Sequence, residues 1–303
     1  MTILPKAVRL VEVGPRDGLQ NETTIVATEK KAEFIALLVR AGLRDIEVTS
    51  FVHPKWVPQL GDGEDLIKRL KPEAGVRYSA LVPNMKGLER AIASGIRRIA
   101  VFTAASETFN RKNINMGIKE SIDGFKPVTD RAYKEGISVR GYVSTCFVCP
   151  YEGAIAKEKV AEVIRALFDL GVDEVSIGDT IGAATPQDVE TTGAHLTKQF
   201  PIDKLAMHFH DTYGMAIANV YQSLQMGFST FDSSAGGLVG CPYAPGASGN
   251  LATEDLLYLL DRLGIETGVS LKMIRRASHF IARELSRDLP SRVLKTTAGE
   301  TIA

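Results

Sequence analysis

Short apolar segments typical of β-strands alternate with amphipathic segments typical of helices along almost the whole chain of 303 residues. The candidate strands are rich in β-branched and aromatic residues and are bounded by Gly, Pro or Asp, as strands commonly are. They span residues 8–13, 45–51, 76–82, 97–103, 138–145, 174–179, 205–210 and 230–237. This alternation predicts an α/β fold with a parallel sheet, and eight strands are the number that closes a (β/α)8 TIM barrel.

The segments between the strands carry apolar residues at helical spacing, and several end in glycine, the expected residue after a helix. They span residues 28–42, 63–70, 84–95, 157–171, 186–200 and 215–227. A doubly wound sheet is the alternative, but no GxGxxG motif follows the first strand. We expect one catalytic domain over residues 1–303, with the barrel at about 7–268 and a C-terminal extension, a helix plus a frayed tail, at about 269–303.

Composition limits the partners of the chain. Lys+Arg and Asp+Glu number 36 each, and no basic stripe is present, so nucleic acid and anionic membranes are poor candidates. Apolar runs such as LATEDLLYLL are broken by charges before they reach the length of a membrane span. Three cysteines do not make a disulfide framework, and the first residues lack signal-peptide or transit character. We therefore expect a soluble cytoplasmic protein.

The segment KLAMHFHDTYG, residues 204–214, carries two histidines at the end of an apolar run. Side chains two apart on a strand point to the same face, so His208 and His210 could share a metal ion. The alternative is a pair of buried histidines that are satisfied by hydrogen bonds. This segment alone does not separate the two interpretations.

Catalytic residues of a TIM barrel lie at the C-terminal ends of its strands, on one rim. Polar residues occupy those predicted ends, and Asp17 and Asn250 among them are the candidates that would complete a metal site. The full set is Arg16, Asp17, Glu47, Asp179, His208, His210, Cys241 and Asn250.

Each of these residues also has a structural interpretation. The PRDG segment around Arg16 and Asp17 has the composition of a turn. Asn250 could be a helix N-cap, and Glu47 could be an ion-pair partner inside the barrel. Cys241 is harder to explain by packing, because it lies on a loop rich in glycine and alanine, where a thiol could move and react.

Cys146 and Cys149 form a CxxC motif. No second CxxC accompanies it, so the spacing favours packing of two buried thiols. A non-catalytic zinc or redox module built on this pair is the alternative from a different functional class.

Several segments resemble the hydroxymethylglutaryl-CoA lyases, a family within the metal-dependent TIM-barrel lyases and synthases that carry an Asp-Arg-Glu set and an HxH pair. The segments are VEVGPRDGLQNE, IEVTSFVHPKWVPQLGD, RGYVST, HFHDTYGMAIAN and GCPYAPGASGNLATEDLLYLL. The resemblance runs from about residue 7 to 270. It implies cleavage of 3-hydroxy-3-methylglutaryl-CoA to acetyl-CoA and acetoacetate, an acyl-CoA substrate, bound magnesium or manganese, a homodimer, and a place in leucine catabolism or ketone-body formation.

The resemblance also implies residue roles. Asp17, His208, His210 and Asn250 match the metal ligands. Arg16 matches the arginine that supports the thioester carbonyl as it becomes an enolate, Glu47 the acid that orients this arginine, and Cys241 the cysteine that handles the proton at the new acetyl carbon. The residues expected to contact substrate are Arg16, Asn113, Tyr142, Asp179 and Thr180.

The chemistry calls for these residue types. A divalent cation on the tertiary hydroxyl of the substrate lowers the pKa of that hydroxyl, and Asp17 or His208 can then take the proton. A fixed guanidinium stabilises the enolate oxygen that forms. Because the ligands mix nitrogen and oxygen, they suit magnesium or manganese less specifically than oxygen alone would, and they also permit zinc.

Five positions depart from the usual pattern of the family: His53, Ala184, Met215, Val239 and Asp288, the last where a basic residue often helps to bind coenzyme A. These departures leave an alternative substrate open. The alternative is another 3-hydroxy-3-substituted acyl-CoA, with an isoprenoid branch or of the citramalyl type.

Overall fold

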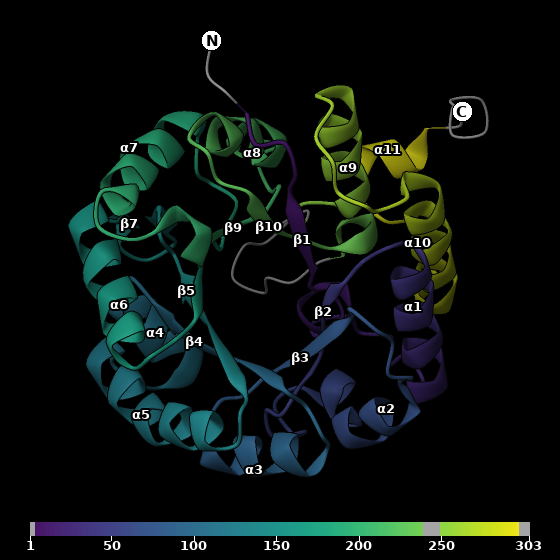
Figure 1. The fold of residues 1–303 in the computed structure, drawn as a ribbon, viewed down its shortest axis with the longest axis horizontal. Coiled ribbons are helices and arrows are strands. Elements are labelled where there is room, and N and C mark those ends of the chain that lie inside the picture. Colours follow the sequence, from purple (N-terminus) through teal and green to yellow (C-terminus); the bar gives the residue numbers. More distant parts are fainter. Residues whose placement is uncertain (1–3, 239–248, 297–303) are drawn as a thin grey trace.

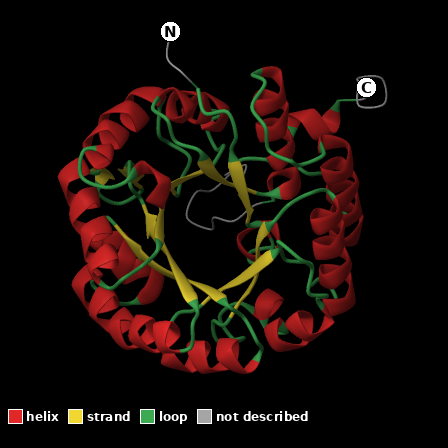
Figure 2. Cartoon of the chain, in the orientation of Figure 1, coloured by secondary structure: helices red, strands yellow, loops and turns green. Residues whose placement is uncertain are grey.

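The computed structural model describes residues 4–238 and 249–296. The eight predicted strands form a closed parallel barrel inside a ring of helices (Figures 1 and 2). In order round the barrel they are β1 (Arg9–Glu12), β2 (Asp45–Ser50), β3 (Arg77–Leu81), β4 (Arg98–Ala104), β5 (Ser138–Ser144), β8 (Glu174–Asp179), β9 (Leu205–Phe209) and β10 (Thr230–Ser233). β10 pairs with β1 and closes the circle, so the predicted (β/α)8 TIM barrel is confirmed.

All six predicted helices are present, each within a few residues of its expected bounds. They are α1 (Thr28–Arg40), α2 (Gly63–Arg69), α3 (Met85–Ala93), α6 (Lys157–Asp169), α7 (Pro186–Thr197) and α8 (Ala216–Gln225). Short helical turns lie in the loops: η1 (Gly14–Gly18), η2 (Pro58–Leu60), η3 (Ile202–Lys204) and η4 (Ala235–Gly237).

The helical pattern of the sequence predicts no helix between the fourth and fifth strands, where the structure has α4 (Glu107–Ile114) and α5 (Ile118–Lys134). Polar residues dominate α4, and α5 contains Gly124 and Pro127, two residues of low helix propensity. Tertiary packing overrides this propensity, because Phe125 and Val128 of α5 are buried in the main core. A small hairpin of β6 (Val148–Cys149) and β7 (Gly153–Ala154) follows β5.

The last helices of the described residues are α9 (Thr253–Arg262), α10 (Leu271–Leu285) and α11 (Arg292–Lys295), and α10 packs between α9 and α1 in the ring (Figure 1). The N-cap of α9 is Ala252, so the interpretation of Asn250 as a helix cap is wrong. The expectation of a frayed tail is also wrong for α11. Ser291 accepts a hydrogen bond from the N–H of Leu294 (3.0 Å), and the Leu294 side chain is buried.

Alternation along the strands decides which side chains enter the barrel. Neighbouring strands place Ile177, Met207 and Phe231 at one level, where they pack toward the helices in the main core. At the next level the same strands align Gly178, His208 and Asp232. Because successive side chains of a strand point to opposite faces, the side chains of His208 and Asp232 face the barrel interior.

Candidate metal centre and active site

His208 on β9 and His210 just after it lie with their Nε2 atoms 3.2 Å apart. Asp17 joins them, and the candidate ligand atoms of the three buried residues all lie within 4.8 Å of one another. His210 Nδ1 is buried and has no hydrogen-bond partner among the described residues. Hydrogen bonds therefore do not satisfy both histidines, which favours the metal interpretation of the pair.

Asp17 reaches this cluster from η1, a single π-helical turn directly after β1. Gly18 N–H donates to the Val13 carbonyl (3.1 Å), and Leu19 N–H donates to the Gly14 carbonyl (3.0 Å). Such wide turns are frequent at functional sites. The PRDG segment is thus a turn, as its composition suggests, and this turn places buried side chains at the C-terminal mouth of the barrel.

Asn250 is held against the same cluster. It forms an antiparallel bridge with His210, and its Nδ2 donates to Asp17 Oδ2 (2.8 Å) and to the Leu238 carbonyl (3.3 Å). Its Oδ1 is buried and has no hydrogen-bond partner among the described residues. The four predicted ligands are therefore gathered in one place, with an amide oxygen available for a cation.

The protonation states suit a divalent cation. Burial and the neighbouring His208 lower the pKa of His210 to about 3, so this imidazole is neutral, which is the form that binds metals. Burial opposes ionisation of Asp17, but Arg16 and the histidines outweigh it and lower the pKa of this carboxyl. Two imidazoles, a carboxylate and an unpartnered amide oxygen are ligands for a divalent ion, so the residues fit the group.

Arg16 lies beside the metal-ligand cluster and is fixed on two sides. Its Nη1 donates to Asp17 Oδ1 (2.8 Å), and its Nε donates to Glu47 Oε1. Burial disfavours the charged guanidinium, but the carboxylates of Glu47 and Asp17 raise its pKa above the usual range. Glu47 is thus the ion-pair partner of Arg16, in a position to orient it.

Tyr142 on β5 completes this side of the site. Its ring lies 5.4 Å from Arg16 Cζ, and its hydroxyl donates to Glu47 Oε2 (3.1 Å). Burial and the Glu47 carboxylate raise the pKa of Tyr142 well above its usual range, so the phenol is neutral. The structure therefore places Tyr142 against Arg16 and Glu47, and its contact with substrate remains a prediction.

Asp232 and Arg140 belong to the site but are not among the residues predicted from the sequence. Asp232 on β10 accepts hydrogen bonds from His208 Nδ1 (3.1 Å), Ser176 Oγ (2.7 Å) and Arg140 Nη2 (2.7 Å). Burial opposes its ionisation, but Arg140 and His208 lower the pKa of Asp232 below its usual range. A charged residue within a predicted barrel strand was the available signal, as it was for Glu47.

A family model described as HMGL-like matches residues 7–281. The chain belongs to the HMGL-like family. A hydroxymethylglutaryl-CoA lyase of Bacillus subtilis is 52% identical over 291 residues, which are 96% of this chain and 97% of that protein. The crystal structure of hydroxymethylglutaryl-CoA lyase from Pseudomonas aeruginosa superposes with a TM-score of 0.96 at 47% identity, over 98% of this chain and 99% of that one. An HMG-CoA lyase from Acinetobacter baumannii in complex with coenzyme A and 3-methylmalate has a TM-score of 0.93 at 35% identity, over 98% of this chain and 97% of that one.

Within this HMGL-like chain, Asp179 and Thr180 make hydrogen bonds to backbone groups. Asp179 Oδ1 accepts from the Ala184 N–H (3.3 Å), and burial raises the pKa of this carboxyl to about 7. Thr180 Oγ1 accepts from the N–H of Thr145 (2.8 Å), whose φ is 54°, a conformation rare for a β-branched residue. Both residues shape the rim, and their contact with substrate remains a prediction, as does that of Asn113 on α4.

The three cysteines divide into two groups. Cys241 lies outside the described residues, so its role remains a prediction. Cys146 and Cys149 are buried free cysteines. Cys146 Sγ donates a hydrogen bond to the Val143 carbonyl (3.0 Å), and Cys149 Sγ donates one to the Ser106 hydroxyl (3.0 Å). Burial raises the pKa of Cys146 to about 12. These contacts favour packing over a zinc or redox module.

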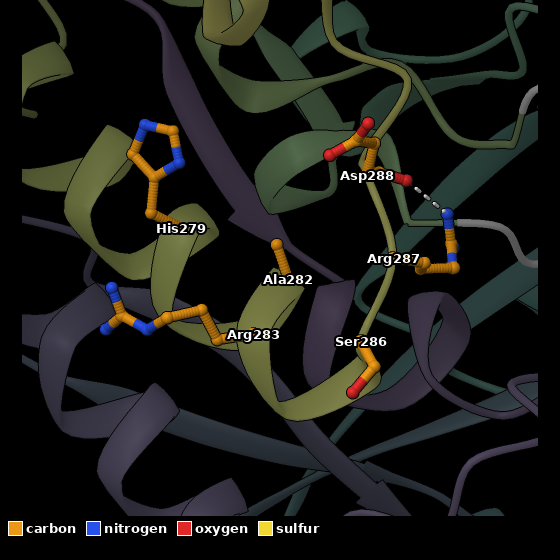
Figure 3. Close-up of a pocket in the computed structure, with 6 residues that line it drawn as sticks. All are labelled: His279, Ala282, Arg283, Ser286, Arg287 and Asp288. Carbon is orange, nitrogen blue, oxygen red and sulfur yellow. Dashed lines mark hydrogen bonds between the residues drawn. The ribbon is translucent and has the colours of Figure 1, made fainter.

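The departures from the family pattern lie at different depths. Ala184 is buried, Met215 is 39% exposed at the start of α8, and Val239 lies outside the described residues. Asp288 lines a hollow of about 590 Å³ at the end of α10. Figure 3 shows this hollow, whose lining residues are His279, Ala282, Arg283, Ser286, Arg287 and Asp288. None of them belongs to the metal-ligand cluster.

Proposed function

We propose that this protein cleaves 3-hydroxy-3-methylglutaryl-CoA to acetyl-CoA and acetoacetate. The observation that carries this proposal is the convergence of four metal-ligand side chains with the Arg16–Glu47 pair at one mouth of the barrel. Its sequence relatives over nearly the full length are hydroxymethylglutaryl-CoA lyases. The reaction breaks the bond between carbons 2 and 3 of the acyl group, and it needs a base, a sink for electrons and an acid.

The base must remove the proton of the tertiary hydroxyl. A divalent cation held by Asp17, His208, His210 and Asn250 would lower the pKa of that hydroxyl. Asp17 and His208 are the groups of this set that can accept the proton. His208 donates from Nδ1 to the Asp232 carboxylate, so it could accept the substrate proton only at Nε2, the atom that a bound ion would occupy. Asp17 is therefore the proposed base.

Arg16 supplies the electron sink. As the bond breaks, carbon 3 becomes the ketone of acetoacetate and the electron pair moves onto the thioester, which becomes an enolate. A guanidinium that is already held by Glu47, Asp17 and the Tyr142 ring can stabilise the enolate oxygen without having to reorient. Carbon 2 then takes one proton and gives acetyl-CoA. The proposed donor is Cys241, on the strength of the sequence resemblance.

The alternative substrates, acyl-CoA esters with an isoprenoid branch or of the citramalyl type, are not favoured. The relatives that are about half identical over nearly the whole chain are named for hydroxymethylglutaryl-CoA.

We further propose magnesium or manganese as the ion, a homodimer as the assembly, and the cytoplasm as the compartment. The carboxylate and amide oxygens support a hard cation. Within residues 4–238 and 249–296, no helix has the length and apolar character to cross a membrane. A related lyase from rat, 49% identical, is named as cytoplasmic, and others are named as mitochondrial.

A product assay tests the reaction. The protein is treated with a chelator, reloaded with magnesium, manganese or zinc, or left without metal, and offered hydroxymethylglutaryl-CoA beside citramalyl-CoA and an isoprenoid-branched analogue. We expect acetoacetate and acetyl-CoA in equal amounts from the first substrate. Absence of acetoacetate with every metal would overturn the proposal, and faster cleavage of another ester would change the substrate but not the reaction class.

His210→Ala tests the metal site, because it removes one imidazole from the ligand set. We expect much weaker binding of Mn²⁺, measured by isothermal titration calorimetry, and loss of activity at limiting metal. His279→Ala is the matched control, since His279 is exposed on α10 and should leave Mn²⁺ affinity unchanged. Normal Mn²⁺ affinity in a folded His210→Ala protein would remove the metal assignment.

A further inference from the structure

An unbroken chain of buried hydrogen bonds joins the metal-ligand cluster to the guanidinium of Arg16. It begins at His208 and runs through four side chains to Arg16. The links are His208 to Asp232 (3.1 Å), Asp232 to Arg140 (2.7 Å), Arg140 to Tyr142 (2.9 Å), Tyr142 to Glu47 (3.1 Å) and Glu47 to Arg16. Each of these residues is at most 8% exposed. Asp232 and Arg140 are the members of this chain that have no role in the reaction proposed above.

The contacts of Asp232 fix the tautomer of His208. A carboxylate only accepts hydrogen bonds, so the Nδ1 atom of His208 must carry a proton to donate to Asp232 Oδ2. A neutral imidazole then has its lone pair on Nε2. This is the atom that faces His210. The hydrogen bond therefore prepares the nitrogen that a metal ion would use.

We propose that Asp232 is a positioning residue that holds His208 in the tautomer and ring orientation required for metal binding, and that Arg140 in turn holds Asp232. This inference rests on the metal site proposed above. Carboxylates that accept from the second nitrogen of a metal-binding histidine fix the ring and raise its basicity as a ligand.

Charge compensation of Arg140 does not account for Asp232. Arg140 already has an ionic partner, since its Nε donates to Glu174 Oε1 (2.7 Å). Asp232 uses one oxygen for Arg140 and the other for His208 and Ser176. One carboxylate thus accepts from three donors. Because Arg140 bonds to one of its oxygens and His208 to the other, the carboxylate couples the position of Arg140 to that of His208.

Asp232→Asn tests the proposal at nearly constant shape. An amide has only one accepting oxygen, so its NH2 group must face either Arg140 or His208, both of which donate. If it faces His208, the imidazole must accept at Nδ1 and carry its proton on Nε2, where it blocks the metal. We expect Mn²⁺ affinity to fall about 10- to 100-fold, the usual effect of losing such a partner.

Asp45→Asn is the matched control. Asp45 is also a buried carboxylate on a barrel strand, 4% exposed, and it accepts two hydrogen bonds from Arg77 (2.7 and 2.6 Å). Its ionic partners among the described residues are arginines, not His208, so Asp45→Asn should keep the Mn²⁺ affinity of the unmodified protein. Equal Mn²⁺ affinity in the two Asp→Asn variants would overturn the proposal.

A nitrogen NMR measurement keeps the test decisive if Asp232→Asn does not fold. The ¹⁵N shifts of the His208 ring in the metal-free unmodified protein should place the proton on Nδ1, and a proton on Nε2 would overturn the proposal. His210→Ala separates this result from failure of the metal site. Loss of Mn²⁺ binding in His210→Ala together with normal binding in Asp232→Asn would refute the role of Asp232 alone.

Discussion

Gly236 is the position at which one added methyl group should disturb the rim most. It lies in η4, directly after β10, with a φ of 71°. Its N–H donates to Glu254 Oε2 (2.8 Å), and its carbonyl accepts from the N–H of Ser291 (3.1 Å). A Cβ built here would lie 2.2 Å from Leu289 Cδ1 and 3.1 Å from Leu289 Cβ. The turn cannot move away from Leu289 without losing hydrogen bonds on both sides.

Two costs add in Gly236→Ala. Placing a residue with a Cβ in the left-handed region costs about 1–2 kcal/mol, and forcing a methyl group into a packed contact costs about 1–3 kcal/mol more. Leu289 is 3% exposed, so its side chain has no open space into which it can turn. We expect the free energy of unfolding to fall by about 2–5 kcal/mol.

Gly264→Ala separates the two costs. Gly264 has nearly the same φ, 69°, but a Cβ there would meet nothing within 4 Å. In this control the free energy of unfolding should fall only by the cost of the left-handed backbone, about 1–2 kcal/mol, as measured by urea unfolding followed by circular dichroism. Equal losses in the two variants would refute the steric reasoning about Leu289.

Three further predictions concern the reaction and the pH dependence of stability. Arg16→Gln should keep Mn²⁺ binding and lower kcat by about 10²–10³-fold, the scale for one lost oxyanion donor; a change confined to KM would make Arg16 a simple binding group. Burial raises the pKa of Glu12 from 4.5 to about 7, so the free energy of unfolding should fall as the pH rises from about 4.5 to 7. Glu12→Gln should remove up to about 3 kcal/mol of that fall, measured by urea unfolding at several pH values. The same pH dependence in the variant and the unmodified protein would contradict this prediction. Cys241→Ala should retain metal and substrate binding but lose most turnover. In the unmodified protein, an alkylating reagent should modify Cys241 first, as peptide mapping would show, and bound substrate should slow this modification. Label first on buried Cys146 or Cys149 would count against this role.

The barrel could be predicted because its strands and helices carry distinct periodicities. Eight short apolar segments, each bounded by turn residues, predict the number of strands. The pair α4 and α5 could not be found in this way, since α5 contains Gly124 and Pro127 and is stabilised by packing of its apolar face against the barrel. Local propensity is a weak guide where tertiary burial supplies the free energy.

The site could be predicted only in part, for a similar reason. Alternation alone placed His208 and His210 on one face, and the barrel topology gathered the polar strand ends. Which partners those side chains would meet depends on contacts between distant strands. Asp232 lies 24 residues from His208 and 92 from Arg140 along the chain. A short strand that is buried on both faces gives no periodic signal of which charged residue faces inward, so these two contacts became visible only in the folded barrel.

The metal-ligand level of the barrel rests on a layer of partly buried ion pairs. The first residues of several strands form this layer, and Glu174 accepts from Arg9, Arg98 and Arg140. Arg140 belongs to both levels, because it also bonds to Tyr142 and Asp232 above. Buried ion pairs add little net stability over well-packed apolar side chains, but they restrict the geometry of the groups they join. An aliphatic layer at the same place could support the fold equally well, yet it would leave Arg140, and through it Asp232 and His208, without the contacts that fix their orientation.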